Sequence, residues 1–380
     1  MLQGIVNSDL NDAATRASAQ KTLDTSAKFR EERQATDKAG ATSNQDGTAP
    51  KVDSVTSQRL IYTMQGSADD ARLPGAWQRD EGSPNASSQD YLVVRTWGNM
   101  AIGLNMFDAT YGRNGIDGVG GRATASIHYG QGFANAFWTS GTNQVVFGDG
   151  NAVLQHFAEV TTLGVHEMTH GLVASTAKFV YQGQSGALDE SFSDVAAVVA
   201  EQRANFQNVD QASWLFGQGC LGPGINGTAL RSLARPGTAY NDPRLGGKDP
   251  QPWHMADYNN TKGDNGGVHI NSGIPNHAFY QVAKRFGGKS WELAGWLWYL
   301  ALTSPTVGPN CDFMTFATAT YGIAVSELSD KQAGQVFSSW ATVGINLKKI
   351  KPPDPRTDDM ITAGGASGTV EEVGELVLTK

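Results

Sequence analysis

The sequence predicts an α+β protein of two lobes with a cleft between them, and three features carry this prediction. Short β-type runs bounded by turn residues occupy residues 58–160, with one helical stretch near 88–112, and indicate a sheet-containing N-terminal lobe. A helical segment with two histidines follows. Apolar residues at helical spacing then indicate a mostly helical C-terminal lobe, in stretches at about 275–286, 290–303, 312–323 and 326–343.

The regions outside these lobes differ from them in composition. Residues 9–35 are charged and helix-forming, whereas residues 36–57 turn to Gly, Ser, Thr, Asn and Pro and indicate a flexible linker, a natural site for proteolytic nicking. A disordered tail without consequence is the alternative for this segment. The last residues lose periodicity and indicate a mobile tail. We therefore divide the chain into segments 1–57, 58–205, 206–349 and 350–380.

Composition excludes several classes of protein. The chain is 39% hydrophobic and 17% charged over 380 residues, which is enough for two packed lobes. Its net charge of −8 argues against nucleic-acid and anionic-membrane partners. No apolar run approaches the length of a membrane span, and 291–302 is better explained as a core helix. We expect a monomer that binds neither nucleic acid nor membrane.

Cysteine usage and the N-terminus bear on location. Cys220 and Cys311 lack the spacing of a zinc site, so we expect free thiols, with a single disulfide as the open alternative. The N-terminus shows no basic segment followed by an apolar one, so no signal peptide is predicted. The expectation is a cytoplasmic precursor, with leaderless secretion as the alternative.

The sequence HEMTH is the strongest local signal. His166 and His170 are four residues apart and lie on one face of a helix, where both imidazoles can bind one Zn²⁺. Glu167 then reaches the open coordination position. This is the arrangement of metal-assisted hydrolysis. A surface helix with two unpaired histidines is the alternative.

A catalytic zinc needs a third protein ligand, and Glu190 is the candidate. Nineteen residues separate it from His170, enough for one helix to end and another to begin. We expect the break at Gly183, Ser185 and Gly186, with Glu190 opening the second helix. Asp194 and Asp189 can accept the spare N–H groups of the histidines and fix their orientation. Alternatively, Glu190 and Asp194 are acids favoured at a helix start.

Several ordered motifs together resemble the thermolysin family of neutral zinc metallopeptidases. They are HEMTH, the gap to Glu190, GALDESFSD, NAFW at 135–138, ALRSL at 229–233 and DNGGVHINSG at 264–273, and the resemblance covers about residues 58–347. The N-terminal segment resembles the short propeptide of the protealysin-like branch in MLQGIVNS and RASAQKTL, although the Pro-Pro start of that propeptide is absent. The resemblance implies a two-lobe thermolysin-like fold and one catalytic zinc.

The resemblance also implies catalytic roles. Glu167 would act as the general base, taking a proton from the attacking water and delivering it to the leaving amine. His269 and Tyr181 match the donors to the oxyanion, and Asp264 matches the carboxylate that orients His269. DNGG is interpreted as a turn leading His269 to a helix whose first turn holds Pro275. Without this context, His269 would be an ordinary core or surface histidine.

Substrate contacts are implied in the same way. Asn135 and Ala136 match the edge strand on which substrates add as an extended strand. Arg231 matches the residue that binds the carbonyl next to the cleaved bond, with a surface ion pair as its alternative. A pocket for a large hydrophobic residue after the scissile bond would be lined by Leu163, Phe216, Cys220 and Leu230. Cys220 would then be open to thiol reagents.

Calcium ligands of the family are largely missing from this chain. Thr162, Ser213, Leu215 and Gln218 stand at most positions of the paired calcium site, where Ca²⁺ needs six to eight oxygens, and only Glu201 remains. Thr228 stands where a further calcium loop needs an acid. We therefore predict that the double calcium site is absent.

Three functions are compared. The first is a zinc endopeptidase that hydrolyses peptide bonds on the N-terminal side of large hydrophobic residues and is made as a self-processing precursor. The second is a zinc aminopeptidase, but such enzymes have an eighteen-residue gap and a GxMEN motif, which this chain lacks. The third is a catalytically silent peptide-binding protein. Such a protein usually lacks the base or a metal ligand, and none is missing here.

Overall fold

The N-terminal segment begins with two helices, α1 (Leu2–Asn7) and α2 (Ala13–Gly40). The computed structural model describes residues 1–40, 58–83 and 89–349. Asp12 caps the start of α2, because its Oδ1 accepts the N–H of Thr15. The predicted linker was placed too early, since residues 36–40 belong to α2, which ends at a glycine. The rest of that linker and the predicted C-terminal tail lie outside the described residues.

A five-stranded sheet forms the core of the first lobe, with strand order β2-β1-β3-β5-β4. Its strands are β1 (Arg59–Thr63), β2 (Ala76–Asp80), β3 (Ala123–Ile127), β4 (Ala136–Thr139) and β5 (Gln144–Phe147). Strands β1, β3 and β5 are parallel, while β2 and β4 run antiparallel at the two edges. The predicted β-type runs are confirmed. Strand β2 was not predicted because its sequence, AWQRD, is mostly polar.

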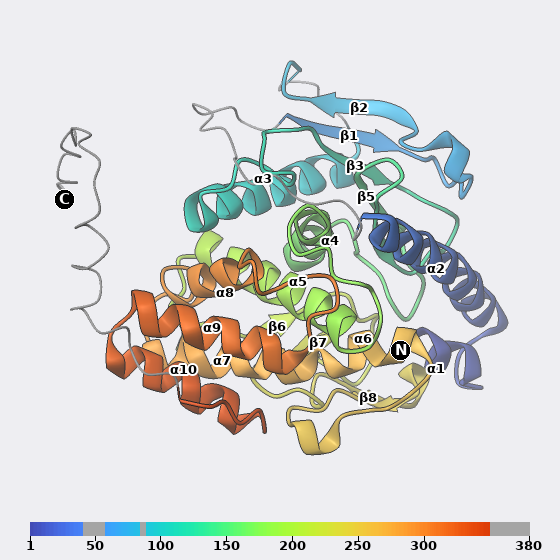
Figure 1. Ribbon diagram of the computed structural model, residues 1–380. Coiled ribbons are helices and arrows are strands. Elements are labelled where there is room, and N and C mark those ends of the chain that lie inside the picture. The colour runs from blue at the N-terminus through green and yellow to red at the C-terminus, as the bar shows by residue number, and fades with distance from the viewer. Residues whose placement is uncertain (41–57, 84–88, 350–380) are drawn as a thin grey trace. The chain divides into compact units, whose positions relative to one another are not determined.

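Helices pack on this sheet and connect it to the second lobe. Helix α3 (Tyr91–Tyr111) contacts β1 and β3, while α4 (Thr161–Ala174) contacts β4 and β5. Figure 1 shows α4 and α5 (Gly183–Ala204) between the sheet and the C-terminal helices. Residues 162–173 of α4 are all buried, so this helix lies at the centre of the fold.

The prediction that α5 opens at Glu190 is wrong, because the helix begins seven residues earlier, at Gly183. Gly183, Ser185 and Gly186 lie inside it and do not form a break. Packing explains the second glycine: a Cβ on Gly186 would lie 2.5 Å from Val268 Cγ1 and 2.9 Å from the carbonyl carbon of Tyr181. Glycine here allows close approach and does not end a helix. Glu190 therefore lies in the body of α5.

The second lobe is mostly helical, as predicted. Its main helices are α6 (Asp264–Asn271), α7 (Gly273–Phe286), α8 (Ala294–Leu302), α9 (Phe313–Glu327) and α10 (Asp330–Thr342). Two short hairpins precede them, β6 (Leu215–Phe216) with β7 (Arg231–Ser232) and β8 (Asn241–Asp242) with β9 (Gly247–Lys248). The rings of Trp298 and Trp340 stack 5.6 Å apart and join α8 to α10. Among the described helices, none has the length and apolar character needed to cross a membrane.

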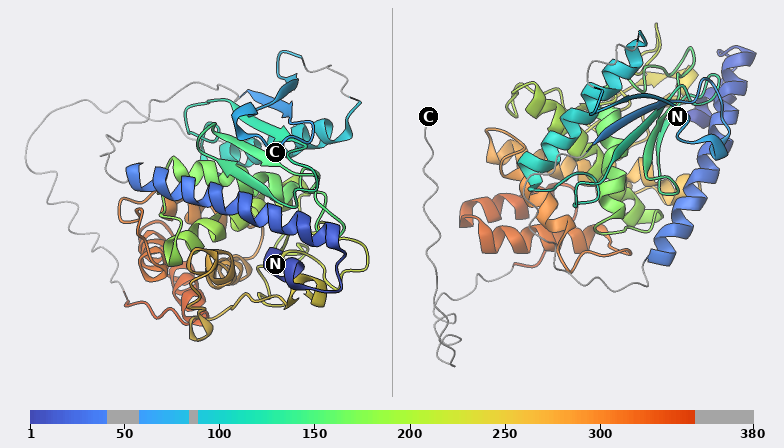
Figure 2. Two further views of the ribbon diagram at one scale, coloured as in Figure 1. Left: turned by 90° about the vertical axis from the view of Figure 1, so that its right-hand side faces the viewer. Right: turned by 90° about the horizontal axis from the view of Figure 1, so that it is seen from above.

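Helix α2 lies along the edge of the sheet that β4 forms. Figure 2 shows this helix, in blue, passing in front of the strands, and it contacts β4 directly. Phe29 stacks on Phe137 with ring centroids 4.0 Å apart, inside a small cluster of buried aromatic and apolar residues. The N-terminal segment is thus packed on the first lobe beside the histidine helix. The described residues up to Leu347 form one compact unit.

Candidate active site

Helices α4 and α5 bring three possible metal ligands together. His166 Nε2 lies 3.4 Å from Glu190 Oε2, and His170 Nε2 lies 3.5 Å from Glu190 Oε1. All three side chains are buried. Zinc bonds of about 2.0–2.1 Å in tetrahedral geometry place ligand atoms roughly 3.3–3.5 Å apart. The three residues therefore fit one zinc ion, as the sequence predicted.

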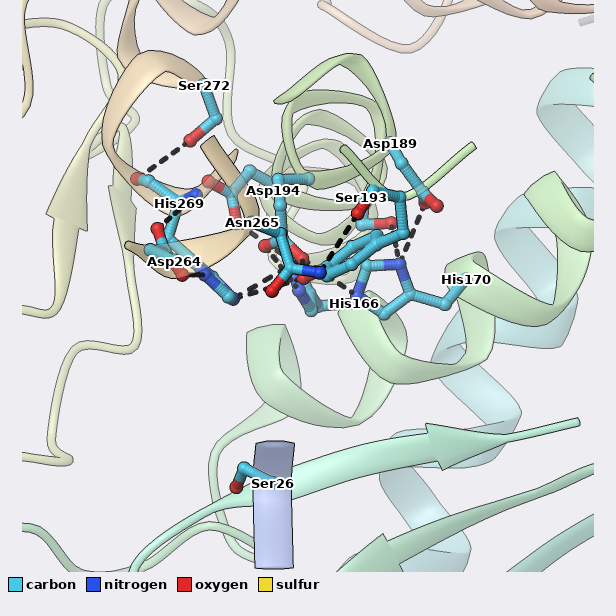
Figure 3. Close-up of polar contacts among 12 residues, drawn as sticks. Ser26, His166, His170, Asp189, Ser193, Asp194, Asp264, Asn265, His269 and Ser272 are labelled. Carbon is cyan, nitrogen blue, oxygen red and sulfur yellow. Dashed lines mark hydrogen bonds and ion pairs between the residues drawn. The ribbon is translucent and has the colours of Figure 1, made fainter. Parts of the chain in front are cut away.

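Carboxylates behind the histidines fix their orientation. His166 Nδ1 lies 3.0 Å from Asp194 Oδ1, and His170 Nδ1 lies 2.9 Å from Asp189 Oδ1. Ser193 Oγ lies a further 3.2 Å from His170 Nδ1. Figure 3 shows Asp189, Ser193 and Asp194 grouped around the two imidazoles. These contacts leave both Nε2 atoms directed at Glu190, as a metal site requires.

The buried carboxylates of Asp194 and Glu190 favour positive charge beside them. Burial lowers the pKa of His166, but hydrogen bonds and charges from Asp194 and Glu190 outweigh it and raise this pKa to about 10. For Glu190, burial raises the pKa, whereas the charges of His269, His170 and His166 lower it well below its usual value. A divalent cation supplies the positive charge that this arrangement favours, which is a second argument for the fit.

Arg231 pairs with the same carboxylate that orients His166. Its Nε and Nη2 donate to Asp194 Oδ2 and Oδ1, both at 2.7 Å, while its guanidinium lies 4.1 Å from the centre of the Phe216 ring. Asn276 Nδ2 donates to Asp194 Oδ2 at 2.9 Å. Arg231 is therefore a mostly buried partner of the site and not a surface ion pair. Sequence reasoning missed Ser193, although it lies within GALDESFSD, and Asn276, which lies outside the quoted motifs.

Tyr181 and His269 lie beside the three possible ligands. Tyr181 Oη donates to Glu190 Oε1 and lies 3.3 Å from His269 Nε2. Asp264 holds His269 twice, because its Oδ1 lies 2.6 Å from His269 Nδ1 and its Oδ2 accepts the backbone N–H of His269 at 3.0 Å. Burial lowers the pKa of His269, but the charges of Asp264 and Glu190 raise it overall.

A left-handed turn carries Asp264 and leads to His269. Residues 264–267 have φ values of 50°, 51°, 78° and 77°. Asn265 Nδ2 donates to the carbonyl oxygen of Tyr181 at 3.2 Å and thereby ties this turn to the Tyr181 segment. Gln251 Nε2 donates to the carbonyl oxygen of His269 at 2.8 Å, a contact that the sequence did not predict. The predicted DNGG turn is confirmed, and Pro275 lies in the first turn of α7.

A cavity of about 140 Å³ opens beside the histidines. Glu167, Tyr181, His269 and Arg231 line it together with the three possible ligands, and so do Asn135, Ala136, Phe137, Trp138, Leu163, Phe216 and Leu230. Glu167 is 7% exposed. The sequence therefore named most of the residues that meet here.

Cys220 was expected in the apolar wall, but the structure does not bring it to this cavity. The residue is fully buried, and burial raises the pKa of its thiol to about 12. A buried, protonated thiol reacts slowly, and the sensitivity of Cys220 to thiol reagents stays a prediction. Cys311 is a free thiol as well.

Helix α2 contributes to the same cavity through Ser26, Phe29 and Arg30. A row of hydroxyls along the helix contacts the chain leading into β4. Ser18 Oγ donates to the carbonyl oxygen of Gly132 at 2.5 Å, and Thr22 Oγ1 accepts the N–H of Ala134 at 3.0 Å. Ser26 Oγ accepts from Asn135 Nδ2 at 3.0 Å. The hydroxyl groups of α2 thus already bind polar groups of Gly132, Ala134 and Asn135 at the rim of the cavity.

Comparisons with known proteins agree with this geometry. Residues 36–174 match the family model for the thermolysin metallopeptidase catalytic domain, and residues 177–345 match that for its alpha-helical domain. The extracellular metalloprotease of Pectobacterium carotovorum subsp. carotovorum is 43% identical over 279 residues, 73% of this chain and 79% of that protein. Protease PrtS of Photorhabdus sp. (strain Az29) is 39% identical over 307 residues, 80% of this chain and 81% of that protein.

A solved structure extends the similarity beyond the residues matched by the family models. The precursor of protealysin, a metalloproteinase from Serratia proteamaculans, superposes with a TM-score of 0.78 at 38% sequence identity, covering 90% of this chain and 97% of that one. That coverage includes chain beyond the two family models. Family, fold and the His166, His170 and Glu190 cluster therefore agree, and the chain belongs to the thermolysin family of metallopeptidases, in which it is a thermolysin-like metalloendopeptidase.

Proposed function

We propose that this metalloendopeptidase cleaves peptide bonds on the amino side of large hydrophobic residues and removes its own N-terminal segment. The observation that carries the proposal is the meeting of three kinds of group at one cavity. These are a buried His-His-Glu cluster, a carboxylate beside it in Glu167, and an apolar wall made by Leu163, Phe216 and Leu230.

The proposed chemistry uses the chain's own residues at each step. His166, His170 and Glu190 hold zinc, which when bound acidifies water to a pKa of about 7 and polarises the scissile carbonyl. Glu167 takes a proton from the attacking water and later gives it to the leaving amine. Tyr181 Oη and His269 Nε2 are 3.3 Å apart, close enough to donate to one oxyanion. Each such donor contributes about 3 kcal/mol to lowering the barrier.

Substrate binding follows from the edge strand. A peptide that pairs with the backbone beside Asn135 and Ala136 adds as an extended strand, because β4 has no neighbour on its outer side among the described strands. Arg231 reaches the carbonyl next to the cleaved bond. The apolar wall takes the side chain that follows this bond.

The N-terminal segment is proposed to block this strand until it is removed. Ser18, Thr22 and Ser26 of α2 already engage the chain before β4, and Phe29 packs on Phe137. We propose residues 1–57 as the prosegment, residues 58–205 and 206–349 as the two lobes, and residues 350–380 as a tail. Removal of the prosegment would uncover Asn135.

Two further proposals concern cofactors and assembly. We propose one zinc per chain, no double calcium site, and a monomer that acts on peptides and proteins. The calcium proposal is supported at Thr162, whose Oγ1 accepts the N–H of Gly217 at 3.0 Å in place of a metal-binding carboxylate.

The test is cleavage of an internally quenched peptide with blocked termini and Leu after the scissile bond. Glu167→Gln should lower the rate by about a thousandfold or more while zinc content stays at one per chain. The matched control is Glu292→Gln, whose side chain is on the surface, 3.5 Å from Lys289. Mass spectrometry should show loss of the N-terminal segment in the wild type and in the control only.

The other outcomes point to the alternatives. A chelator should abolish cleavage and added zinc should restore it. Release of single N-terminal residues from unblocked peptides, with no cleavage of the blocked one, would indicate an aminopeptidase. Full zinc occupancy without any cleavage, after the N-terminal segment has been removed, would indicate a silent peptide-binding protein.

A further inference from the structure

A second cavity, of about 680 Å³, lies beyond the histidine helix. Its lining includes Gly171 and Ala174 of α4, the residue Trp138 at the end of β4, and three charged residues, Asp117, Arg122 and Lys178. Trp138 also lines the first cavity. The two cavities are therefore neighbours that share Trp138 in their linings.

The order of residues along α4 gives the direction of a bound substrate. Leu163 lines the apolar wall, His166 and His170 come next, and Gly171 and Ala174 line the second cavity. The metal ligands thus lie between the two. Strand β4 gives the same direction, because it leads from Ala136, which lines the first cavity, to Trp138, which lines both cavities. If the residue after the cleaved bond occupies the apolar wall, the residues before that bond extend toward the second cavity.

The rise of helix α4, compared with that of an extended peptide, shows which substrate residues reach the second cavity. From His170 to Ala174 the helix rises about 6 Å. An extended peptide rises about 3.3 Å per residue, so this distance corresponds to roughly two substrate residues. The second cavity is therefore in reach of the second to fourth residues before the cleaved bond.

The charged side chains of the cavity carry a net positive charge. Neither Arg122 nor Lys178 forms an ion pair with another residue in the described part of the chain. The single acid, Asp117, is used by its own loop, because its Oδ1 accepts the N–H groups of Val119 at 3.0 Å and Gly121 at 3.1 Å. The two cations are thus free to meet a substrate carboxylate.

Lys178 has a second unusual property. Its φ of 52° places it in the left-handed region, which costs a residue with a Cβ roughly 1 kcal/mol or more relative to glycine. Its backbone N–H is nonetheless held by the carbonyl oxygen of Val173 at 2.9 Å. The fold therefore fixes the backbone of Lys178 at the edge of the cavity.

We propose that the second cavity is a substrate subsite for acidic side chains at the second to fourth positions before the cleaved bond. This inference rests on the proposed function. Arg122 and Lys178 attract the substrate carboxylate, and Trp138 separates this subsite from the metal ligands. Cleavage sites of this enzyme are then defined by an acidic residue upstream and a large apolar residue downstream.

The test compares three blocked, quenched peptides that have Leu after the scissile bond and differ only in Glu, Gln or Lys three residues before it. For the wild-type protein, kcat/KM should be about three- to tenfold higher with Glu than with Gln and lowest with Lys, and added salt should reduce the difference. The double variant Arg122→Gln/Lys178→Asn should equalise the Glu and Gln peptides. Asparagine is chosen because it tolerates the left-handed backbone.

A matched control separates the subsite from overall charge. Arg235→Gln/Lys248→Gln removes two cations from the surface around Trp253, outside both cavities, and should keep the preference for Glu. Equal cleavage of Glu and Gln peptides by the wild type, or a preference that survives in the first double variant, would overturn the proposal. An equal loss of the preference for Glu in both double variants would also overturn the proposal. If even the Gln peptide is not cleaved in a zinc-dependent manner, the proposed function itself has failed.

Discussion

His128 is held between two carboxylates on the surface of the first lobe. Its Nδ1 lies 2.7 Å from Asp149 Oδ1 and its Nε2 lies 2.8 Å from Asp90 Oδ2. Asp90 also caps α3, because its Oδ1 accepts the N–H of Leu92 at 2.9 Å. The hydrogen bond to Asp149 raises the pKa of His128 most, and although burial lowers it, the pKa reaches about 9. A protonated His128 therefore links α3 to the loop after β5.

This link predicts a pH dependence of stability. Because the pKa is raised from 6.5 in the unfolded chain to about 9 in the folded one, the stabilisation is complete below pH 6.5 and is lost as pH rises through 9. Solvent screening limits it to about 1 kcal/mol. In a Glu167→Gln background, which prevents autolysis, denaturant unfolding should show this loss between pH 6 and pH 10. His128→Asn should remove it.

The choice of variant and control follows from the backbone. His128 has a φ of 56°, which asparagine tolerates. His156 has a φ of 64° and, among the described residues, a single acidic partner, Glu159, so His156→Asn is the matched control and should leave the pH dependence unchanged. An equal pH dependence in His128→Asn and the unsubstituted protein would show that other groups are responsible.

At the residue scale, the sequence predicted the parts of the site that lie in motifs. His166, His170 and Glu190 meet as expected because their spacing on two helices leaves little freedom, and Tyr181 reaches them from the short segment that joins these helices. Gln251 and Asn276 could not be found, since they reach the site only through contacts between distant segments. Cys220 was misplaced for the same reason. Whether a residue faces a cavity or the core is decided by tertiary packing.

At the scale of elements, the left-handed turn at 264–267 connects the two proposed oxyanion donors. It carries Asp264, which holds His269, and its Asn265 is tied to the backbone of Tyr181. Left-handed backbone in residues with a Cβ is costly and persists where surrounding contacts fix it. Both Asp264 and Asn265 have this left-handed backbone conformation. The turn is therefore a rigid support for the site.

Gly266→Ala should damage this support. Its φ is 78°, and a Cβ would lie 2.9 Å from Gln182 Nε2 and 3.1 Å from the backbone nitrogen of Gly183. We expect a loss of about 1–3 kcal/mol in unfolding free energy. Peptide cleavage should show a fall in kcat with little change in KM, because the displaced donors act in the transition state.

Gly334→Ala is the matched control for that substitution. This glycine is exposed within α10, and a Cβ there would meet nothing within 4 Å. Alanine should stabilise the helix by about 1 kcal/mol and leave kcat unchanged. An unchanged kcat in Gly266→Ala would show that the turn does not position Tyr181 and His269.

The elements that sequence predicted best are those whose packing is local. Helices α7 to α10 follow from apolar periodicity, and the predicted strands follow from short apolar runs. The start of α5 was misjudged because the glycines of its first turn resemble a break. The role of Gly186, which allows close contact with Tyr181 and Val268, appears only in three dimensions.

At the scale of the whole molecule, one continuous cluster of buried apolar residues extends from Ile5 to Leu347. It includes residues of α1, the sheet, α4, α5 and the C-terminal helices. The possible metal ligands on α4 and α5 lie buried within this unit, so their charges are part of its core. Stability of the whole unit should therefore depend on the metal.

Removing the metal should lower the melting temperature of the unit as a whole. A ligand present at a thousandfold excess over its Kd stabilises the folded state by about 4 kcal/mol, which corresponds to a shift of several degrees for a protein of this size. Scanning calorimetry of Glu167→Gln before and after chelation should show this shift, and added zinc should reverse it. His170→Ala should melt at the lower temperature with or without zinc.

The same calorimetric experiment, with calcium added, tests the proposed absence of the double calcium site. Thr162 is already hydrogen-bonded to Gly217, and burial raises the pKa of Glu201, which makes that carboxyl a poor isolated ligand. Millimolar Ca²⁺ added to the zinc-loaded protein should therefore leave the melting temperature unchanged. A rise that saturates with two ions per chain would contradict the proposed absence of the double calcium site, whereas the zinc-dependent shift would still identify His166, His170 and Glu190 as the metal centre.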